Sequence, residues 1–226
     1  PQSTFSAPYY NLLEILTHIR HSEKVFNMKR LLLILILTFS FQTWTKADDI
    51  RDFEIEGISV GDSLLDYMTI NEIKIALPNS SEVGTGVEKF IVIWGPVSMK
   101  NIYDQFQVTY KFNDKKYLVH ALDGQLNFID DFEGCKIKMQ EIEKDIENLL
   151  KNIKPSKWQA KHIADKTGKS KVVATDFILN SSGQIQIWCT DWSKKMFEKH
   201  KWEDDLNVSL RSEEYQDYID SPKYNK

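Results

Sequence analysis

The sequence predicts an α+β domain in which helices cover a mainly antiparallel β-sheet. Apolar residues alternate with polar ones in successive segments joined by tight turns, and a long segment with helical spacing stands apart from them. Strands that follow one another through short turns, with helices set apart, are typical of an antiparallel sheet. The chain has 226 residues, 42% hydrophobic and 27% charged, so we expect a single domain with appendages.

A secretory signal peptide is predicted in front of this domain, at residues 28–47. Met28-Lys29-Arg30 precedes a continuous apolar run, and the small residues Thr45 and Ala47 suit the cleavage pocket of a signal peptidase. An uncleaved anchor is the alternative, but crossing the hydrocarbon takes about 20 apolar residues and this run is shorter. We therefore expect cleavage after Ala47.

The predicted cleavage divides the chain into three parts. Residues 1–27 lack an initiator methionine and are interpreted as translation of upstream sequence, whereas residues 48–226 form the exported domain. Without residues 1–47, 24 basic and 31 acidic side chains remain. An acidic surface does not bind a phosphate backbone by counterion release, which argues against nucleic acid as a partner. We expect a periplasmic or extracellular location, with membrane contact only during export through the signal peptide.

The first elements of the domain are short. Residues 54–61 are expected to be extended, and Asp62 or Ser63 can then cap a helix. The apolar residues assigned to that helix are Leu64, Leu65, Met68 and Ile73. Residues 90–94 form a short apolar run that ends at Gly95-Pro96, which favours a buried strand.

The middle of the chain predicts a three-strand meander at residues 106–112, 117–121 and 126–128. Its expected turns are Asn113-Asp114 and Asp123-Gly124. The second is a strong hairpin signal, because glycine tolerates a positive φ angle.

A long helix and a second hairpin follow. Residues 133–153 have helical spacing, with an apolar stripe of Cys135, Met139, Ile142, Ile146, Leu149 and Leu150. Residues 172–179 and 184–192 are expected to pair around the turn at 180–183. Ser193 is expected to cap a short helix, residues 206–210 to form an edge strand, and Ser212 to begin a last helical turn.

Gly61-Asp62-Ser63-Leu64 resembles the nucleophile motif of the GDSL family of esterases and lipases, over these four residues. The resemblance implies that Ser63 is a nucleophile activated by a histidine three residues after an aspartate. No aspartate stands three residues before His120, His162 or His200, and the family's Gly-x-Asn-Asp motif is missing. A helix cap is therefore the preferred interpretation, and a GDSL-type hydrolase is the alternative function.

Other motifs of enzyme chemistry are incomplete. Gly168-Lys169-Ser170 resembles the end of a phosphate-binding loop, but Ile163 stands where that loop requires glycine. No two histidines of the domain have metal-ligand spacing, and the acidic pairs Asp130-Asp131 and Asp204-Asp205 lack the pattern of a calcium loop. These pairs are interpreted as solvated turns, and we expect no metal and no cofactor.

Cys135 and Cys189 are the two cysteines of the chain. Export would place them in an oxidising compartment, which favours a disulfide between the predicted long helix and the second hairpin. Two buried thiols that pack as small apolar groups are the alternative.

Trp188 and Trp192 share one face of a predicted strand. Exposed indole rings can form a platform for a ligand, and packing in the core is the alternative.

Two segments, residues 57–67 and 188–193, together with the signal peptide and the Asp48-Asp49 start, resemble small exported proteins of uncharacterised function from marine alphaproteobacteria. The resemblance implies export and no particular activity. We therefore expect a non-enzymatic binding or envelope-associated domain, which uses its sheet, its aromatic residues or an edge strand to bind an unknown protein or small ligand.

Overall fold

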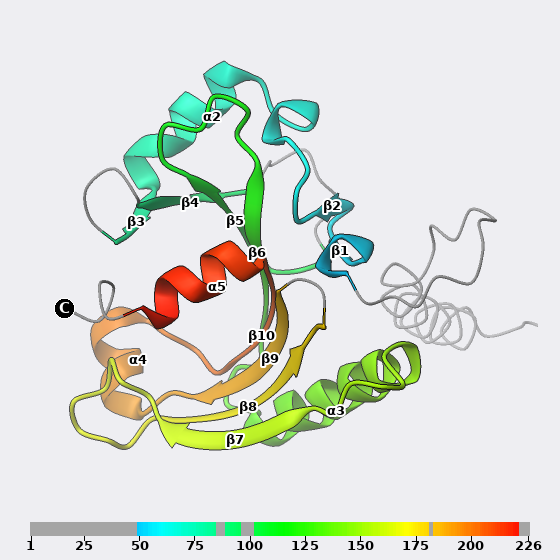
Figure 1. Cartoon of the computed structure of the whole chain (residues 1–226). Helices are drawn as coiled ribbons and strands as arrows, with labels where there is room; N and C mark the ends of the chain where they lie inside the picture. Colours follow the sequence, from blue (N-terminus) through cyan, green and yellow to red (C-terminus); the bar gives the residue numbers. More distant parts are fainter. Residues whose placement is uncertain (1–48, 85–88, 96–101, 181–182, 222–226) are drawn as a thin grey trace, which may run out of the picture. The chain divides into compact units, whose positions relative to one another are not determined.

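A computed structural model of the chain describes residues 49–84, 89–95, 102–180 and 183–221 (Figure 1). The predicted upstream segment, residues 1–27, and the predicted signal peptide, residues 28–47, lie outside the described residues. Within the described residues, no helix has both the length and the apolar character needed to cross a membrane.

One antiparallel sheet of eight strands organises the fold, as the α+β prediction requires. The strand order is β3-β4-β5-β6-β10-β9-β8-β7. The sheet is therefore two meanders of four strands that meet where β6 pairs with β10. The strands are β3 (Ser81–Val83), β4 (Phe90–Trp94), β5 (Gln105–Lys111), β6 (Val119–Asn127), β7 (Ser156–Lys161), β8 (Lys171–Ile178), β9 (Gln184–Asp191) and β10 (Asp205–Arg211).

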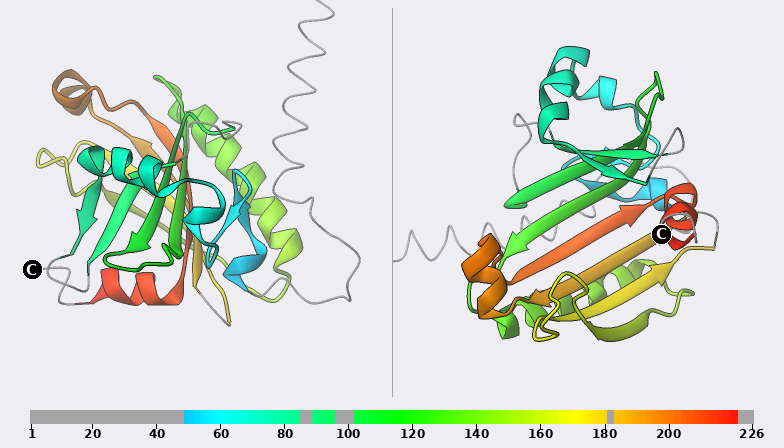
Figure 2. Two further views of the ribbon diagram at one scale, coloured as in Figure 1. Left: turned by 90° about the horizontal axis from the view of Figure 1, so that it is seen from above. Right: turned by 90° about the vertical axis from the view of Figure 1, so that its left-hand side faces the viewer.

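The helices differ in length and in position. The α-helices are α2 (Ile70–Ala76), α3 (Phe132–Leu149), α4 (Lys194–His200) and α5 (Glu213–Asp220), and the 3-10 helices are η1 (Ile50–Asp52), η2 (Leu64–Asp66) and η3 (Leu77–Asn79). A separate pair of short strands, β1 (Glu54–Ile55) and β2 (Ile58–Ser59), lies against β6. The long helix α3 covers β9 and β10 on one face of the sheet. Figure 2 shows α3 behind the sheet and α4 and α5 at two ends of its front face.

The two faces of the sheet differ in polarity. The face beneath α3 is apolar and buried, and its central residues are Leu122, Phe177, Ile185, Ile187, Cys189, Leu206, Val208 and Leu210. Side chains alternate between faces along a strand, so the intervening positions, which are mostly polar, lie on the opposite face. The hydrophobic core thus fixes which polar side chains share the other side.

The expected hairpin turn at Asp123-Gly124 is wrong. β6 runs without a break through both residues, and Gly124 pairs with Phe106 on one side and with Val208 on the other. A Cβ atom on Gly124 would come within 2.7 Å of the Tyr103 ring. The glycine therefore serves close packing inside a strand. The second and third strands of the predicted meander are therefore one strand, β6, which follows β5 in the four-strand meander from β3 to β6.

Substituting Gly124 by alanine is expected to destabilise the fold by about 1–3 kcal/mol, because the added methyl overpacks a filled space. Tyr103 is 9% exposed and its ring has little room to move. Chemical unfolding of Gly124→Ala measures the cost. The same substitution made together with Tyr103→Val should cost clearly less than it does alone; an equal cost in both backgrounds would contradict the proposed clash.

The predicted N-terminal helix is divided in two. Ser63 caps η2, and its Oγ accepts a hydrogen bond from the backbone N–H of Leu65. The α-helix α2 starts later, at Thr69, where the side chains of Thr69 and Glu72 form a capping box. The segment expected to be extended, residues 54–61, doubles back at Glu56-Gly57, both with positive φ, to form β1 and β2.

Two strands differ from expectation in their position. β10, expected at an edge, lies in the middle of the sheet between β6 and β9. The edge strands are β3 and β7. The sequence did not indicate β7, because every residue of β7 is exposed and no apolar alternation marks it. The predicted pairing of β8 with β9 is confirmed, and the long helix lies at Phe132–Leu149, close to the expected 133–153.

Candidate functional site: the polar face of the sheet

The face of the sheet opposite α3 carries mostly polar side chains, and we call it the polar face. Strand register places Asn207 of β10 between Gln125 of β6 and Trp188 of β9. The neighbouring row places Ser209 between Asp123 and Gln186. The other members that face the same side are Gln105 and Gln107 on β5, Asn127 on β6, Asp176 on β8, Thr190 on β9 and Asp205 and Arg211 on β10.

Helices limit the polar face at two ends (Figure 2). At one end, Tyr215 of α5 packs with Phe90 and Ala121 in a small apolar cluster. At the other end, α4 follows β9 and precedes β10. The middle of the face lies between these helices, and α3 is on the opposite side of the sheet.

A pocket of about 230 Å³ opens on the polar face beside the end of α4. Its walls combine amide, carboxylate and indole side chains, namely Gln105, Gln125, Asn127, Trp192, Lys201, Trp202, Glu203 and Asp205. Three strands and the segment between α4 and β10 supply seven of these residues, and Trp192 comes from the segment between β9 and α4. The site is therefore assembled only when β5, β6 and β10 are adjacent.

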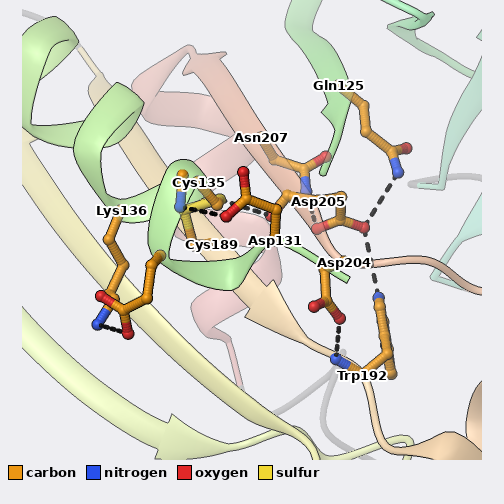
Figure 3. The surroundings of a disulfide bond; sticks show 11 residues. Gln125, Asp131, Cys135, Lys136, Cys189, Trp192, Asp204, Asp205 and Asn207 are labelled. Carbon is orange, nitrogen blue, oxygen red and sulfur yellow. Dashed lines mark hydrogen bonds and ion pairs between the residues drawn. A yellow bond between two sulfur atoms is a disulfide. The ribbon is translucent and has the colours of Figure 1, made fainter. Parts of the chain in front are cut away.

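Asp205 is the most buried of the polar residues in the pocket, at 7% exposure. Its Oδ2 accepts hydrogen bonds from Gln125 Nε2 at 3.0 Å and from Trp192 Nε1 at 3.4 Å, and its Oδ1 accepts one from Asn207 Nδ2 at 2.8 Å (Figure 3). Burial raises the pKa of Asp205 to about 6, against the lowering effect of hydrogen bonds from Thr190, Trp192 and Asn207. The carboxylate thus orients two pocket side chains, Gln125 and Trp192, and the adjacent Asn207.

The raised pKa of Asp205 predicts that its contribution to stability is lost as the pH rises. Between about pH 4 and 6 the folded state binds more protons than the unfolded state, so this contribution is complete below pH 4 and gone above pH 6. A shift of two pKa units corresponds to at most about 3 kcal/mol. Urea unfolding at pH 4 and at pH 7.5 measures the free energies of unfolding of wild type and Asp205→Asn. We expect that of wild type to fall relative to that of the variant as the pH rises. If the difference between the two free energies is the same at both pH values, Asp205 is excluded as the titrating group.

Four aromatic rings form a row of contacts beside the pocket, in which His200 and Trp202 are stacked and the other two pairs are tilted. The ring centroids of His162 and Trp192 lie 4.2 Å apart, those of Trp192 and Trp202 lie 4.6 Å apart, and those of Trp202 and His200 lie 4.5 Å apart. Burial lowers the pKa of His162, which favours its neutral form. These ring contacts hold the two indole rings of the pocket wall in place.

The two tryptophans of the expected platform lie at different places on the polar face. Trp192 follows the end of β9 and lines the pocket. Trp188 lies near the centre of the face, where the Arg211 guanidinium is 5.8 Å from its ring centroid. Arg211 also donates a hydrogen bond from Nε to Ser209 Oγ. Burial raises the pKa of the nearby Asp123, whereas the positive charge of Arg211 lowers it. The pocket wall is therefore formed by Trp192 and Trp202, and Trp188 is not part of it.

The structure brings Cys135 and Cys189 together as a disulfide, with 6.1 Å between their Cα atoms. The bond joins α3 to β9 across the apolar face. Cys135 Sγ also lies 3.2 Å from the backbone oxygen of Asp205, on the side of β10 opposite the pocket (Figure 3). The covalent link is therefore part of the support of the pocket.

Ser63, the residue expected to be a nucleophile if the GDSL resemblance held, lies away from the polar face. Its hydroxyl donates to the backbone oxygen of Lys116 at 2.7 Å and caps η2. The side-chain hydrogen bond of His120 goes to Ser212, and His162 accepts one from the backbone N–H of Ala164. Within the described residues, the geometry assigns the Ser63 hydroxyl to capping.

Of the two acidic pairs, Asp130-Asp131 is an exposed turn before α3, as expected, whereas Asp204-Asp205 has a structural role instead. Asp131 caps α3, Asp204 accepts from the backbone N–H of Trp192, and Asp205 is buried in the pocket wall. No cluster of three metal-ligating side chains occurs among the described ranges. The Gly168-Lys169-Ser170 segment is a turn before β8, and Gly168 has a positive φ.

The sequence did not indicate a binding role for most of the pocket residues. Gln105, Gln125 and Asn127 belong to no motif, and Asp205 was marked only as part of an acidic pair interpreted as a solvated turn. The shared face of these residues depends on the pairing of β6 with β10. Their only local signal is a polar residue at alternate positions of a strand. No protein-family model, curated protein or solved structure matches this chain.

Proposed function

We propose that this chain is an exported, non-enzymatic binding domain that takes a small polar ligand in the pocket of the polar face. The observation that carries the proposal is the pairing of two indole rings, Trp192 and Trp202, with amide side chains from β5 and β6 around one opening. Amides both donate and accept hydrogen bonds, and indole rings add apolar contact area.

The size and chemistry of the pocket favour a ligand such as a sugar ring or a short peptide unit. Pockets for drug-sized molecules are about 300–1,000 Å³ and mostly apolar, whereas this one is about 230 Å³ and lined mainly by polar side chains. The Asp205 carboxylate is held by protein donors, which suits orientation of neighbouring groups more than proton transfer to a ligand. These features support binding without chemistry.

The proposed export is supported by the predicted signal peptide and by the disulfide. Disulfides persist in oxidising compartments such as the periplasm and are rare in the cytosol. N-terminal sequencing of the chain recovered after export tests this part: a start at Asp48 is the expected result. A start within residues 1–27 would contradict the cleavage.

Ligand binding is tested by tryptophan fluorescence and thermal shift with a defined panel of monosaccharides, disaccharides and dipeptides. We expect at least one class to bind, and Trp202→Ala to weaken its affinity about tenfold, which corresponds to about 1.4 kcal/mol of lost stacking. Trp158→Ala is the matched control, because Trp158 is 40% exposed and Trp202 is 38% exposed, but Trp158 lies on the edge strand β7.

Two results would contradict the proposal. The first is the absence of any binding by the folded chain across the panel. The second is an equal loss of affinity in Trp158→Ala and Trp202→Ala, which would show that the pocket is not where the ligand binds.

A further inference from the structure

One end of this acidic domain is basic. Two segments form this end: residues 161–171, and residues 194–201, which contain α4. Together they hold eight lysines and two acidic residues. We call these two segments the lysine end. Outside residues 1–47 and outside the lysine end, 16 basic and 29 acidic residues remain. All eight lysines are exposed, namely Lys161, Lys166, Lys169, Lys171, Lys194, Lys195, Lys199 and Lys201.

The two segments are held together by one buried carboxylate. Asp165 accepts hydrogen bonds from the backbone N–H groups and the hydroxyls of Thr167 and Ser170, and from the hydroxyl of Ser193 at 2.8 Å. Ser193 is the residue that begins α4. This acid therefore points inward and links the loop to the helix, which lie side by side in Figure 1.

The acidic neighbours of the lysine end neutralise it only weakly. The ion pair of Lys194 with Glu198 spans 3.8 Å and that of Lys171 with Asp191 spans 3.9 Å. Both pairs are exposed on the lysine side, and exposed ion pairs of this kind contribute little, because water screens the two charges. The positive charge of this end is thus available to a partner.

Exposed apolar side chains lie among the lysines. Ile163, in the loop that Asp165 organises, is 86% exposed, and Phe197 of α4 is 42% exposed. Met196, next to Phe197, is buried and fixes α4 to the domain. A preorganised loop that presents an isoleucine to solvent loses little conformational freedom when it binds.

We propose that the lysine end docks on the surface of an anionic phospholipid bilayer, with Ile163 and Phe197 entering the headgroup region. Lysines near such a surface contribute about 1 kcal/mol each, and apolar side chains at the boundary add to the attraction. The sequence alone led us to expect membrane contact only during export, and the lysine end argues for contact by the folded domain as well.

The residue types favour a bilayer over a compact anion or a soluble polyanion. Only lysines supply the charge, whereas recognition of a single phosphate or carboxylate group favours the bidentate fork of arginine. The charge is spread over two segments, as suits a diffuse surface potential. A soluble polyanion would pair with the lysines and leave Ile163 in water, but a bilayer also removes its side chain from water.

The test uses sedimentation with vesicles of phosphatidylcholine alone and of phosphatidylcholine with 30% phosphatidylglycerol. The chain recovered after export is expected to bind only the anionic vesicles, and added salt should weaken this binding. Lys166→Gln/Lys169→Gln is expected to reduce the affinity by about tenfold or more, since each lysine contributes about 1 kcal/mol. Ile163→Asn is expected to reduce it by several fold.

The matched control is Lys115→Gln/Lys116→Gln, which removes the same charge from two exposed lysines in the turn between β5 and β6. This variant should retain most of the binding, and circular dichroism confirms that each variant is folded. None of the substituted residues lines the pocket, so the outcome is independent of the proposed ligand binding.

Three outcomes would overturn the proposal. One is equal binding, or none, to both kinds of vesicle. Another is an equal effect of the control variant and of Lys166→Gln/Lys169→Gln. The third combines two results: tight binding to heparin, a soluble polyanion, and no effect of Ile163→Asn on vesicle binding. These results together would show that the lysine end binds polyanions in general.

Discussion

Removing the Cys135–Cys189 disulfide is expected to lower the free energy of unfolding by about 4 kcal/mol. The two cysteines are 54 residues apart in sequence, and in the chain-entropy model a closed loop of this size restricts the unfolded chain by about that amount. Both residues are fully buried between α3 and the sheet. Urea unfolding of Cys135→Ala/Cys189→Ala against wild type, both without reductant, measures the effect.

The control for this prediction is the response to reductant. The double variant should unfold at the same urea concentration with and without reductant, whereas wild type that has been reduced in the unfolded state should approach the variant. If wild type shows two reactive thiols when denatured without reductant, the bond is absent from the molecule in solution.

Removing the ammonium group of Lys157 is expected to destabilise the fold by about 3–4 kcal/mol. The Glu143 side chain of α3 is 7% exposed, and it accepts hydrogen bonds from the Thr175 hydroxyl and from Lys157 Nζ, the latter at 2.5 Å. Lys157→Met would leave the buried carboxylate without a cation, and breaking a buried pair from one side typically costs 3–5 kcal/mol. Because Lys157 is itself half exposed, we expect the lower part of that range.

A double-mutant cycle separates the lost attraction from the stranded charge. Glu143→Leu removes the buried carboxylate and adds apolar contact, so Glu143→Leu/Lys157→Met should be close to wild type in stability. Chemical unfolding of the four proteins gives the coupling energy. Additive effects of the two substitutions would show that Glu143 and Lys157 do not interact in solution.

Glu143 also shows what helical periodicity can predict and what it cannot. The position lies on the buried stripe of α3, between Met139 and Ile146. Spacing alone therefore predicts that its side chain faces the sheet, but it does not indicate a partner. That partner, Lys157, comes from β7, an edge strand whose exposed residues carry no alternation.

The candidate site was less accessible to sequence reasoning than the fold. Trp192 and the cysteine pair could be singled out by residue type, because indole rings and paired thiols are rare and chemically distinctive. Gln125 and Asn127 could not, since glutamine and asparagine are common on any surface, and the Asp204-Asp205 pair predicted only a solvated turn. Their role depends on the pairing of β6 with β10, which joins residues about 80 positions apart.

The sequence by itself determined the α+β class, the long helix and the hairpin of β8 with β9, because these depend on apolar spacing within one segment. The tertiary structure alone decided that β6 continues through Asp123-Gly124 and that Asp205 is buried. A local turn preference of this kind is weak beside the pairing of a strand with two neighbours and the packing of Tyr103 against Gly124. Burial of a polar side chain likewise depends on contacts between segments far apart in the chain.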